Sequence, residues 1–221
     1  MAGKMFPFIT TTWNPLGGEC KHECSYCWAK QLTKKYNMQK YTGQPTLNTK
    51  ESYRTFKPTD FVFTCDMTDL FGSWVPSEMI QAVLNMVEVS PAKFLLLTKN
   101  PIRYLEFKLP KNAVAGATIE SDIGRNGFAP KLFSRIEAMR QVKHAKMVSI
   151  EPIMDFSENF PYAIVSTKPD FVAVGYDNYN NGLPEPSLDR TKDLIAVLQD
   201  WHIKVYEKTM RERLEAPLLR T

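Results

Sequence analysis

The chain has 221 residues, a formal net charge of +4, 43% hydrophobic residues and 24% charged residues. These proportions are ordinary for a folded protein with a hydrophobic core, and they exclude a disordered chain, a collagen-like fibre and an acidic solvating protein. No stretch approaches the roughly 18 consecutive apolar residues of a membrane span, and the first residues carry no apolar run of signal-peptide length. We therefore expect a cytoplasmic protein with no membrane contact.

Seven short segments rich in β-branched and aromatic residues are predicted to be strands. Most are apolar nearly throughout, as parallel strands covered on both faces should be. In chain order they are Phe8–Trp13, Phe61–Cys65, Phe94–Thr98, Ala113–Glu120, Lys146–Glu151, Phe171–Gly175 and Lys204–Glu207.

Six longer amphipathic segments alternate with these strands and predict helices. Three of them have a proline near their first turn, where a missing N–H costs nothing. They are Cys24–Tyr36, Pro76–Val89, Pro101–Phe107, Pro130–Val142, Asn159–Val165 and Ser187–Asp200. The alternation predicts an α/β fold with a parallel sheet, which we expect to be a partial (β/α) barrel of about six strands. With no internal repeat, we expect a single domain over residues 1–221.

Polar residues gather where the predicted strands end. In parallel β/α sheets the chemistry lies on these carboxyl ends and on the loops that follow them. The polar runs are Thr12–Asn14, Cys65–Asp69, Thr98–Asn100, Thr118–Ser121, Glu151–Pro152, Gly175–Asn178 and Glu207–Lys208. We expect one edge of the sheet to be functional, although loops are often polar without any function.

Three of the four cysteines lie within eight positions. Cys20, Cys24 and Cys27 have the spacing C-x3-C-x2-C on a tight loop that enters a predicted helix, and Tyr26 precedes the last of them. In a reducing compartment such clustering usually indicates metal or redox chemistry. Three thiolates can hold three irons of a [4Fe-4S] cubane and leave the fourth iron open to a small molecule. Two preceding glycines would let the backbone wrap closely around the inorganic sulfides.

Two other interpretations of this loop stay open. Cys20, His22, Cys24 and Cys27 could hold zinc, which takes four nitrogen or sulfur ligands in a closed tetrahedron. His22, however, lies only two residues from a cysteine on either side, which is cramped for one ion, and we expect it to be an exposed loop residue. The cysteines could also be unligated.

The C-x3-C-x-aromatic-C loop after the first strand of a β/α sheet resembles the radical S-adenosylmethionine (radical SAM) superfamily. Further strings, spread over nearly the whole chain, resemble a radical SAM-like family common in bacteriophages and marked by three cysteines. These strings are Thr12–Pro15, Asp66–Phe71, Leu97–Pro101, Ser149–Pro152 and Tyr206–Lys208. The pattern departs after the sixth strand, where Gly175–Asn178 stands in place of Gly-Gly-Glu-Ser, so the resemblance does not extend to a shared substrate.

The resemblance implies two cofactors, a [4Fe-4S] cluster on the three clustered cysteines and S-adenosylmethionine (SAM). In the superfamily, the open iron chelates the methionyl amine and carboxylate of SAM. An electron from the reduced cluster cleaves the sulfonium, and the 5′-deoxyadenosyl radical removes a hydrogen atom from the substrate. The implied partner is an external electron donor of the flavodoxin or ferredoxin type.

The resemblance also implies that side chains at the strand ends bind SAM or substrate. Any of them could instead be a solvated charge or a surface salt bridge. The assignments are Tyr26 to adenine; Asp66, Thr68 and Asp69 to the methionyl amine; Thr118, Glu120 and Ser121 to the ribose hydroxyls; Arg135 to the methionyl carboxylate; the backbone of Ile150–Pro152 to adenine; and Lys99, Glu151 and Lys208 to substrate binding or proton transfer.

The fourth cysteine, Cys65, ends the second predicted strand, apart from the other three. If it points into the barrel, it could donate a hydrogen atom to a substrate radical, because S–H bonds are weak. Free cysteine is also among the most buried residue types and often acts as a small hydrophobe. Cys65 is therefore a candidate catalytic residue with a structural alternative.

Positive charge is concentrated in residues 30–58. The segment carries seven lysines and arginines against one acid, with three tyrosines and one phenylalanine among them. Basic residues with aromatics suit a nucleic-acid surface, through phosphate neutralisation and base stacking. A solvated lysine-rich face is the plainer interpretation.

Three functions remain in view. The first, which we favour, is a radical SAM enzyme acting on a nucleobase in DNA or RNA, as modification or repair, with the base leaving its stack to reach a buried radical. The second is the same chemistry on a small metabolite or peptide. The third is a non-catalytic iron–sulfur or zinc protein that binds nucleic acid or a partner.

Overall fold

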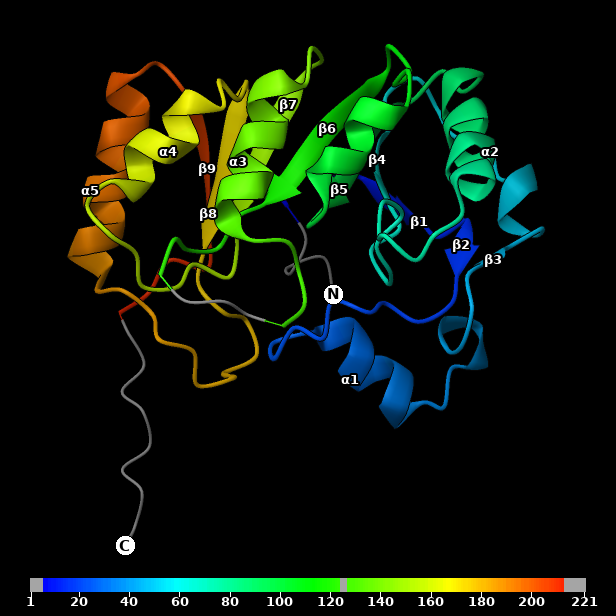
Figure 1. Cartoon of the computed structure of the whole chain (residues 1–221), viewed down its shortest axis with the longest axis horizontal. Helices are drawn as coiled ribbons and strands as arrows, with labels where there is room; N and C mark the ends of the chain where they lie inside the picture. The colour runs from blue at the N-terminus through cyan, green and yellow to red at the C-terminus, as the bar shows by residue number, and fades with distance from the viewer. Residues whose placement is uncertain (1–5, 124–126, 213–221) are drawn as a thin grey trace, which may run out of the picture.

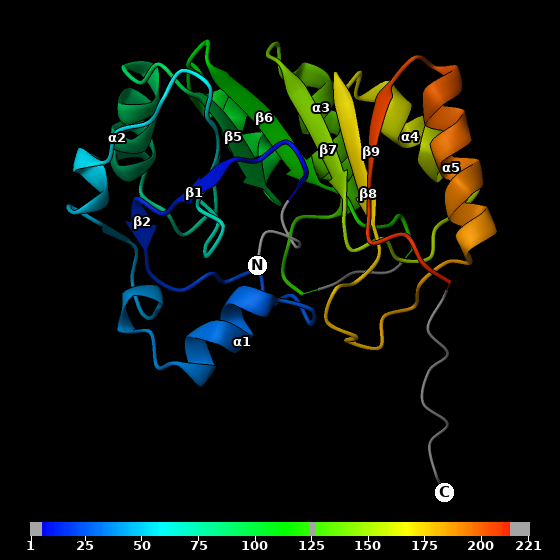
Figure 2. The same cartoon turned by 180° about the vertical axis from the view of Figure 1, so that it is seen from behind.

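Parallel pairing joins seven strands in strict chain order into one sheet, and a computed structural model describes this fold for residues 6–123 and 127–212. The sheet curls into half of a barrel (Figures 1 and 2). The strands are β1 (Thr11–Trp13), β4 (Phe61–Thr64), β5 (Lys93–Thr98), β6 (Ala113–Thr118), β7 (Lys146–Ile150), β8 (Phe171–Gly175) and β9 (Lys204–Lys208). The α/β class, the parallel sheet and its partial-barrel form are confirmed, with seven strands rather than about six.

Four α-helices cover the outer face of this sheet, and a fifth lies below the carboxyl ends of the strands (Figure 1). The covering helices are α2 (Ser77–Glu88), α3 (Leu132–Gln141), α4 (Phe160–Ser166) and α5 (Leu188–Asp200), and the helix below is α1 (Trp28–Lys35). The predicted helix Pro101–Phe107 is instead a 3-10 helix, η3 (Pro101–Glu106). Among the described residues, none of the helices has the length and hydropathy needed to cross a membrane.

A short excursion joins β1 to β4. An antiparallel pair, β2 (Leu16–Gly17) and β3 (Thr46–Leu47), brackets α1, and two 3-10 helices, η1 (Gln39–Tyr41) and η2 (Glu51–Tyr53), complete the excursion. The loop with the three cysteines lies between β2 and α1. The pair β2–β3 therefore holds both ends of the segment that contains the cysteine loop.

Strand side chains alternate between two apolar faces. One set packs under the helices; it includes Val62, Phe94, Leu96, Val148 and Val172. The other set lines the concave face; it includes Phe63, Leu95, Val114, Met147 and Ala173. Because successive residues of a strand point to opposite faces, the next concave positions toward the carboxyl ends are polar, at Thr118, Ser149 and Lys208.

The segment before β1 closes the concave side of the half-barrel. The Phe8 ring centroid lies 5.3 Å from that of Phe61 on β4, 5.2 Å from that of Phe171 on β8 and 4.9 Å from that of Tyr206 on β9. Phe6 stacks on Phe8 at 5.4 Å. These rings fill the space between the early and late strands of the curled sheet. The predicted strand Phe8–Trp13 is accordingly a strand only from Thr11, because its first residues leave the sheet to form this plug.

Phe8→Ala should lower the free energy of unfolding by about 2–3 kcal/mol, because it removes a half-buried ring that contacts both sides of the sheet. Urea denaturation followed by circular dichroism measures this. Phe128→Ala, at a ring that is 72% exposed, is the matched control and should change stability by less than about 0.5 kcal/mol. Equal losses in the two variants would contradict the role of Phe8 as a plug.

Candidate functional site

The three clustered cysteines lie below the carboxyl ends of the strands and face one cavity. Cys20, Cys24 and Cys27 are each half-buried, and all three line a hollow of about 180 Å³. The Cys27 sulfur also caps α1, since it accepts from the backbone N–H of Lys30 at 3.3 Å. Burial raises the pKa of the Cys20 thiol to about 12, and the Asp69 carboxylate adds to this shift, so the uncoordinated thiol holds its proton.

The two glycines before the cysteines serve close packing of the chain. Gly18 has φ +94°, and a Cβ on it would lie 2.6 Å from the carbonyl oxygen of Gln44. A Cβ on Gly17 would lie 2.6 Å from the carbonyl oxygen of Lys40. The small residues are therefore required where the loop meets residues 40–45, whatever the cysteines bind.

His22, inside the cysteine loop, is buried, so the expectation of an exposed residue was wrong. Its Nε2 lies 2.7 Å from Oδ2 of Asp69, and its ring meets Trp74 edge-on with centroids 4.9 Å apart. The backbone of the loop is held as well, because the N–H of Phe128 donates to the carbonyl oxygen of His22 at 2.6 Å. His22 thus lines the cavity of the cysteines and anchors their loop through its contact with Asp69.

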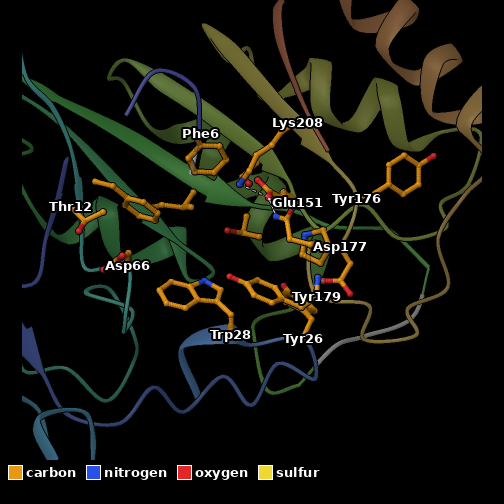
Figure 3. A pocket seen from close by; sticks show the side chains of 16 residues that line it. Phe6, Thr12, Tyr26, Trp28, Asp66, Glu151, Tyr176, Asp177, Tyr179 and Lys208 are labelled. Atoms are coloured by element: carbon orange, nitrogen blue, oxygen red, sulfur yellow. Dashed lines mark hydrogen bonds and ion pairs between the residues drawn. The ribbon is translucent and has the colours of Figure 1, made fainter. Parts of the chain in front are cut away.

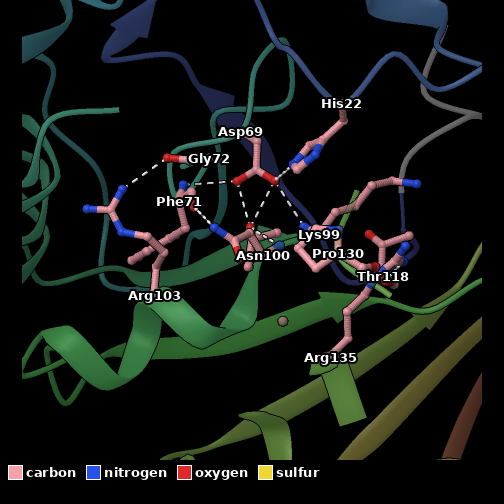
Figure 4. A network of polar contacts seen from close by, with 12 residues as sticks. His22, Asp69, Phe71, Gly72, Lys99, Asn100, Arg103, Thr118, Pro130 and Arg135 are labelled. Atoms are coloured by element: carbon pink, nitrogen blue, oxygen red, sulfur yellow. Dashed lines mark hydrogen bonds and ion pairs between the residues drawn. The ribbon is translucent and has the colours of Figure 1, made fainter. Parts of the chain in front are cut away.

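Asp69 is the buried acceptor at the centre of this anchor (Figure 4). Besides the His22 contact, its carboxylate accepts from the Thr98 hydroxyl at 2.7 and 2.9 Å, and from the backbone N–H groups of Lys99 and Phe71 at 2.9 Å each. Burial alone would raise the pKa of Asp69, but these hydrogen bonds outweigh it and the pKa is lowered. The carboxylate is already saturated by protein donors, so we correct its assignment from the methionyl amine to the positioning of the cysteine loop.

A second buried group surrounds Glu120. One carboxylate oxygen accepts from Arg135 at 2.7 Å, and the other accepts from both Lys99 and the Tyr26 hydroxyl. Lys99 also contacts the Tyr26 hydroxyl, and burial lowers the pKa of its ammonium to about 8. Arg135 donates further to the carbonyl oxygens of Thr118 (2.8 Å) and Pro130 (2.7 Å).

This arrangement corrects two predicted assignments. Glu120 and Arg135 line neither of the two cavities at the strand ends, because each neutralises the other inside the protein. Glu120 is therefore not placed for the ribose, nor Arg135 for a methionyl carboxylate. Lys99 and Tyr26 do reach the cavity of the cysteines, so this buried group orients the two side chains that face it.

A larger cavity of about 380 Å³ adjoins that of the cysteines, and the two share Tyr26, Trp28, Asp66, Thr118 and Glu151 among their lining residues. They form one continuous hollow, whose volume is in the range of small-molecule sites, about 300–1,000 Å³. Figure 3 shows Trp28 and Tyr26 on one side of the larger cavity and Phe6 opposite them.

One wall of the larger cavity carries an ion pair (Figure 3). Lys208 Nζ lies 2.6 Å from Oε1 of Glu151, and the Asn178 amide donates to the same oxygen at 3.1 Å. Burial raises the pKa of Glu151, although Lys208 and Asn178 act against the shift. The structure thus brings together two of the predicted substrate-binding residues.

The remaining predicted residues divide between the hollow and the packed interior. Asp66 and Thr118 line both cavities, Thr68 and Cys65 line the smaller one, and Glu151 and Pro152 follow β7 into the hollow. Ser121 does not fit its predicted role, because its hydroxyl donates to the carbonyl oxygen of Asp155 and accepts from the backbone N–H of Ile123 at 2.9 Å. The Ile150 side chain belongs to the core under the helices. Cys65 is 3% exposed, so it is both buried and cavity-lining, and its two interpretations stay open.

Several lining residues were missed from the sequence, and three of them show why. Phe6 precedes the first strand and gives no local signal of a site. Trp28 begins an amphipathic helix and is indistinguishable there from a core residue. Asn178 belongs to the strand-end run Gly175–Asn178, which was singled out without any residue being assigned. The strand-end rule could have found Asn178.

Two of the four aromatic side chains in the basic segment 30–58 pack into the protein. Tyr41 is buried, and Phe56 packs against Trp13 and Phe94, with ring centroids 5.8 and 5.4 Å apart. Tyr36 and Tyr53 are 62% and 86% exposed. Lys30 and Lys34 line a third cavity, of about 310 Å³, that the three cysteines border from their other side. The segment therefore adjoins the cysteine loop both at Lys30 and Lys34 and around residues 40–45, and its later part packs against β1.

Comparison with protein families gives one match. A family model described as a protein of unknown function (DUF5131) matches residues 5–178, which is more than half of the chain and includes all four cysteines. Searches of curated proteins and of solved structures found no match.

Asp69→Asn should lower the free energy of unfolding by about 3 kcal/mol, because His22 and the backbone donors lose a buried anionic partner. In the metal-free protein, the loop cysteines should also react faster with a thiol reagent. Asp189→Asn makes the same change at a side chain that is 94% exposed and should do neither. Urea denaturation and the thiol-labelling rate measure the two effects, and unchanged labelling in a folded Asp69→Asn protein would contradict the anchoring role.

Proposed function

We propose that the chain, which belongs to the DUF5131 family of proteins of unknown function, is a radical SAM enzyme with a [4Fe-4S] cluster on Cys20, Cys24 and Cys27. When bound, the cluster supplies the electron that cleaves SAM reductively, and the 5′-deoxyadenosyl radical so formed abstracts hydrogen from the substrate. One observation carries this proposal. All three cysteines line a cavity at the carboxyl ends of a curled parallel sheet, and that cavity continues into a larger one.

The donor set suits a cubane better than a single ion. Within residues 6–123 and 127–212, no three His, Cys, Asp or Glu side chains converge closely enough to hold one metal ion. Zinc would need four nitrogen or sulfur ligands within about 2.0–2.3 Å of one point, which this lack of convergence does not provide. In a cubane each thiolate binds a separate iron, so three sulfurs on one loop need not converge on a single point.

The chain's own side chains would hold SAM between the cysteines and the larger cavity. Asp66 offers a carboxylate for an amine, and the Thr118 hydroxyl lies where both cavities meet. Tyr26 is held by Glu120 and Lys99 and presents its ring to the hollow. Tyr26, Trp28 and Phe63 line both cavities, so the protein's contribution would be to orient SAM and to limit the access of water.

The substrate we propose is a nucleobase, free or within a nucleic acid. Lys30 and Lys34 adjoin the cysteine loop and Tyr36 is exposed on the same helix, which suits contact with a nucleic-acid backbone and its bases. A small metabolite or peptide is the alternative. The sequence has no second group of cysteines, so the electron would come from an external flavodoxin- or ferredoxin-type donor.

Single alanine substitutions of Cys20, Cys24 or Cys27 should each abolish the visible absorbance of protein reconstituted without oxygen with iron and sulfide. They should also abolish the release of 5′-deoxyadenosine from SAM under a reductant, measured by chromatography. Cys65→Ala is the matched control and should keep the absorbance, because Cys65 lies outside the ligand set. Loss of absorbance in Cys65→Ala, or its retention in a loop variant, would show that the ligands are wrongly assigned.

A further inference from the structure

We infer that the Glu151–Lys208 end of the larger cavity is the substrate subsite, and that it binds the hydrogen-bonding edge of an uncharged, planar nitrogen heterocycle of the nucleobase type. This inference rests on the proposed function, because it takes the cysteine end of the hollow to hold the cofactors.

The hollow has two chemically different ends. The smaller cavity contains the three cysteines together with Cys65, Thr68 and Lys99. The larger cavity contains none of these and is bounded instead by Lys208 and Asn178. Glu151 lines both cavities and so lies where a cofactor at one end would meet a ligand at the other. A substrate at the Lys208 end would therefore adjoin the cofactors without displacing them.

The polar groups at this end favour an uncharged ligand. The Glu151 and Lys208 side chains are only 12% and 10% exposed, and they already neutralise each other at 2.6 Å. A cationic ligand would be repelled by Lys208 and an anionic one by Glu151, and either would have to compete with a short, partly desolvated pair. The Asp66 and Asp177 carboxylates also line this cavity. Neutral donors occupy their oxygens without removing their charge, so the lining disfavours an anionic ligand further.

One carboxylate oxygen of Glu151 is available to accept a hydrogen bond from a ligand. Its Oε1 accepts from Lys208 and Asn178, whereas its Oε2 has no hydrogen-bond partner within the described parts of the chain. A ligand N–H can therefore bind Oε2 without breaking the ion pair. The Lys208 ammonium has two further N–H donors for a ligand acceptor beside it. A neighbouring donor and acceptor is the pattern along the edge of a nucleobase.

The walls of the cavity suit a flat ring. Phe6, Trp28 and Phe63 line it, and the Tyr26 ring faces it from the cysteine side (Figure 3). Lys208 Nζ lies 5.2 Å from the centroid of the Phe6 ring, so the ammonium is held beside an aromatic surface. Aromatic side chains bind nucleobases by stacking without regard to sequence. A zwitterionic amino acid would instead require the Glu151–Lys208 pair to separate.

Titration calorimetry on the full, cluster-loaded chain tests this subsite. The probes are adenosine, cytidine, guanosine and uridine, matching single-stranded oligonucleotides, and phenylalanine as an aromatic zwitterion. At least one nucleoside or oligonucleotide should bind, and its affinity should fall about tenfold or more in Glu151→Gln, which replaces a charged acceptor. Glu158→Gln makes the same change at an exposed position and should bind as the unaltered protein does. Binding of the nucleosides indicates that the substrate is a base outside a nucleic-acid strand. Binding of the oligonucleotides alone indicates that it is a base within a strand.

The subsite would be overturned if none of the base-containing probes bound. It would also be overturned if a probe bound the Glu151→Gln variant as tightly as the unaltered protein. Phenylalanine bound in a Glu151-dependent manner would also overturn it, in favour of a zwitterionic substrate. If Glu151→Gln does not fold, Lys208→Gln tests the same edge and should weaken binding similarly. Release of 5′-deoxyadenosine is measured separately, so a protein that cleaves SAM but binds no base refutes this inference and leaves the proposed radical SAM chemistry, with the small metabolite or peptide as substrate, standing.

Discussion

The buried Asp69 carboxylate is the constraint on which the site depends. It joins three segments that are distant in sequence: the cysteine loop through His22, the end of β5 through Thr98 and Lys99, and its own loop through Phe71. A buried anion with so many donors is stable only in one arrangement of those donors, because leaving any of them unpaired is costly. The position of the cysteines relative to the sheet is set largely by this one group.

The curled sheet forms the cavities that the cysteines face. Alternation along the strands places apolar side chains on the concave face and polar ones at its carboxyl end, and the Phe6–Phe8 plug closes the open side. Glu120 forms ion pairs with two buried cations, Lys99 and Arg135, beside the cysteine loop. The resulting hollow has thiols at one end, an ion pair at the other and aromatic walls between them.

Much of this could be predicted from the sequence because it depends on local pattern. Apolar runs located all seven strands, amphipathic periods located the helices, and cysteine spacing located the loop. The strand-end rule placed Asp66, Thr118, Glu151 and Lys208 at one edge, since parallel strands end together.

The partners of these residues could not be predicted, because tertiary packing chooses them. Nothing in the sequence shows that His22 meets Asp69, 47 residues away, or that Arg135 turns to Glu120 rather than to a ligand. The position of Phe8 could not be predicted for a related reason. Phe8 continues the apolar run of β1 in the sequence, but in the folded protein it leaves the sheet and packs between the early and late strands. The resemblance to radical SAM proteins assigned roles to residues by their position in the chain. In the structure, some of these residues line the cavities and others are buried in the protein beside them.

The central claim is that the cysteine loop carries a cluster with one iron open to SAM, in a hollow whose far end takes a substrate. Electron paramagnetic resonance of the reduced, anaerobically prepared protein, with and without SAM, tests it most directly. The account predicts iron and sulfide in the proportion of a [4Fe-4S] cluster and a signal that changes when SAM is added. A colourless protein with stoichiometric zinc, or a cluster signal that SAM leaves unaltered, would contradict it.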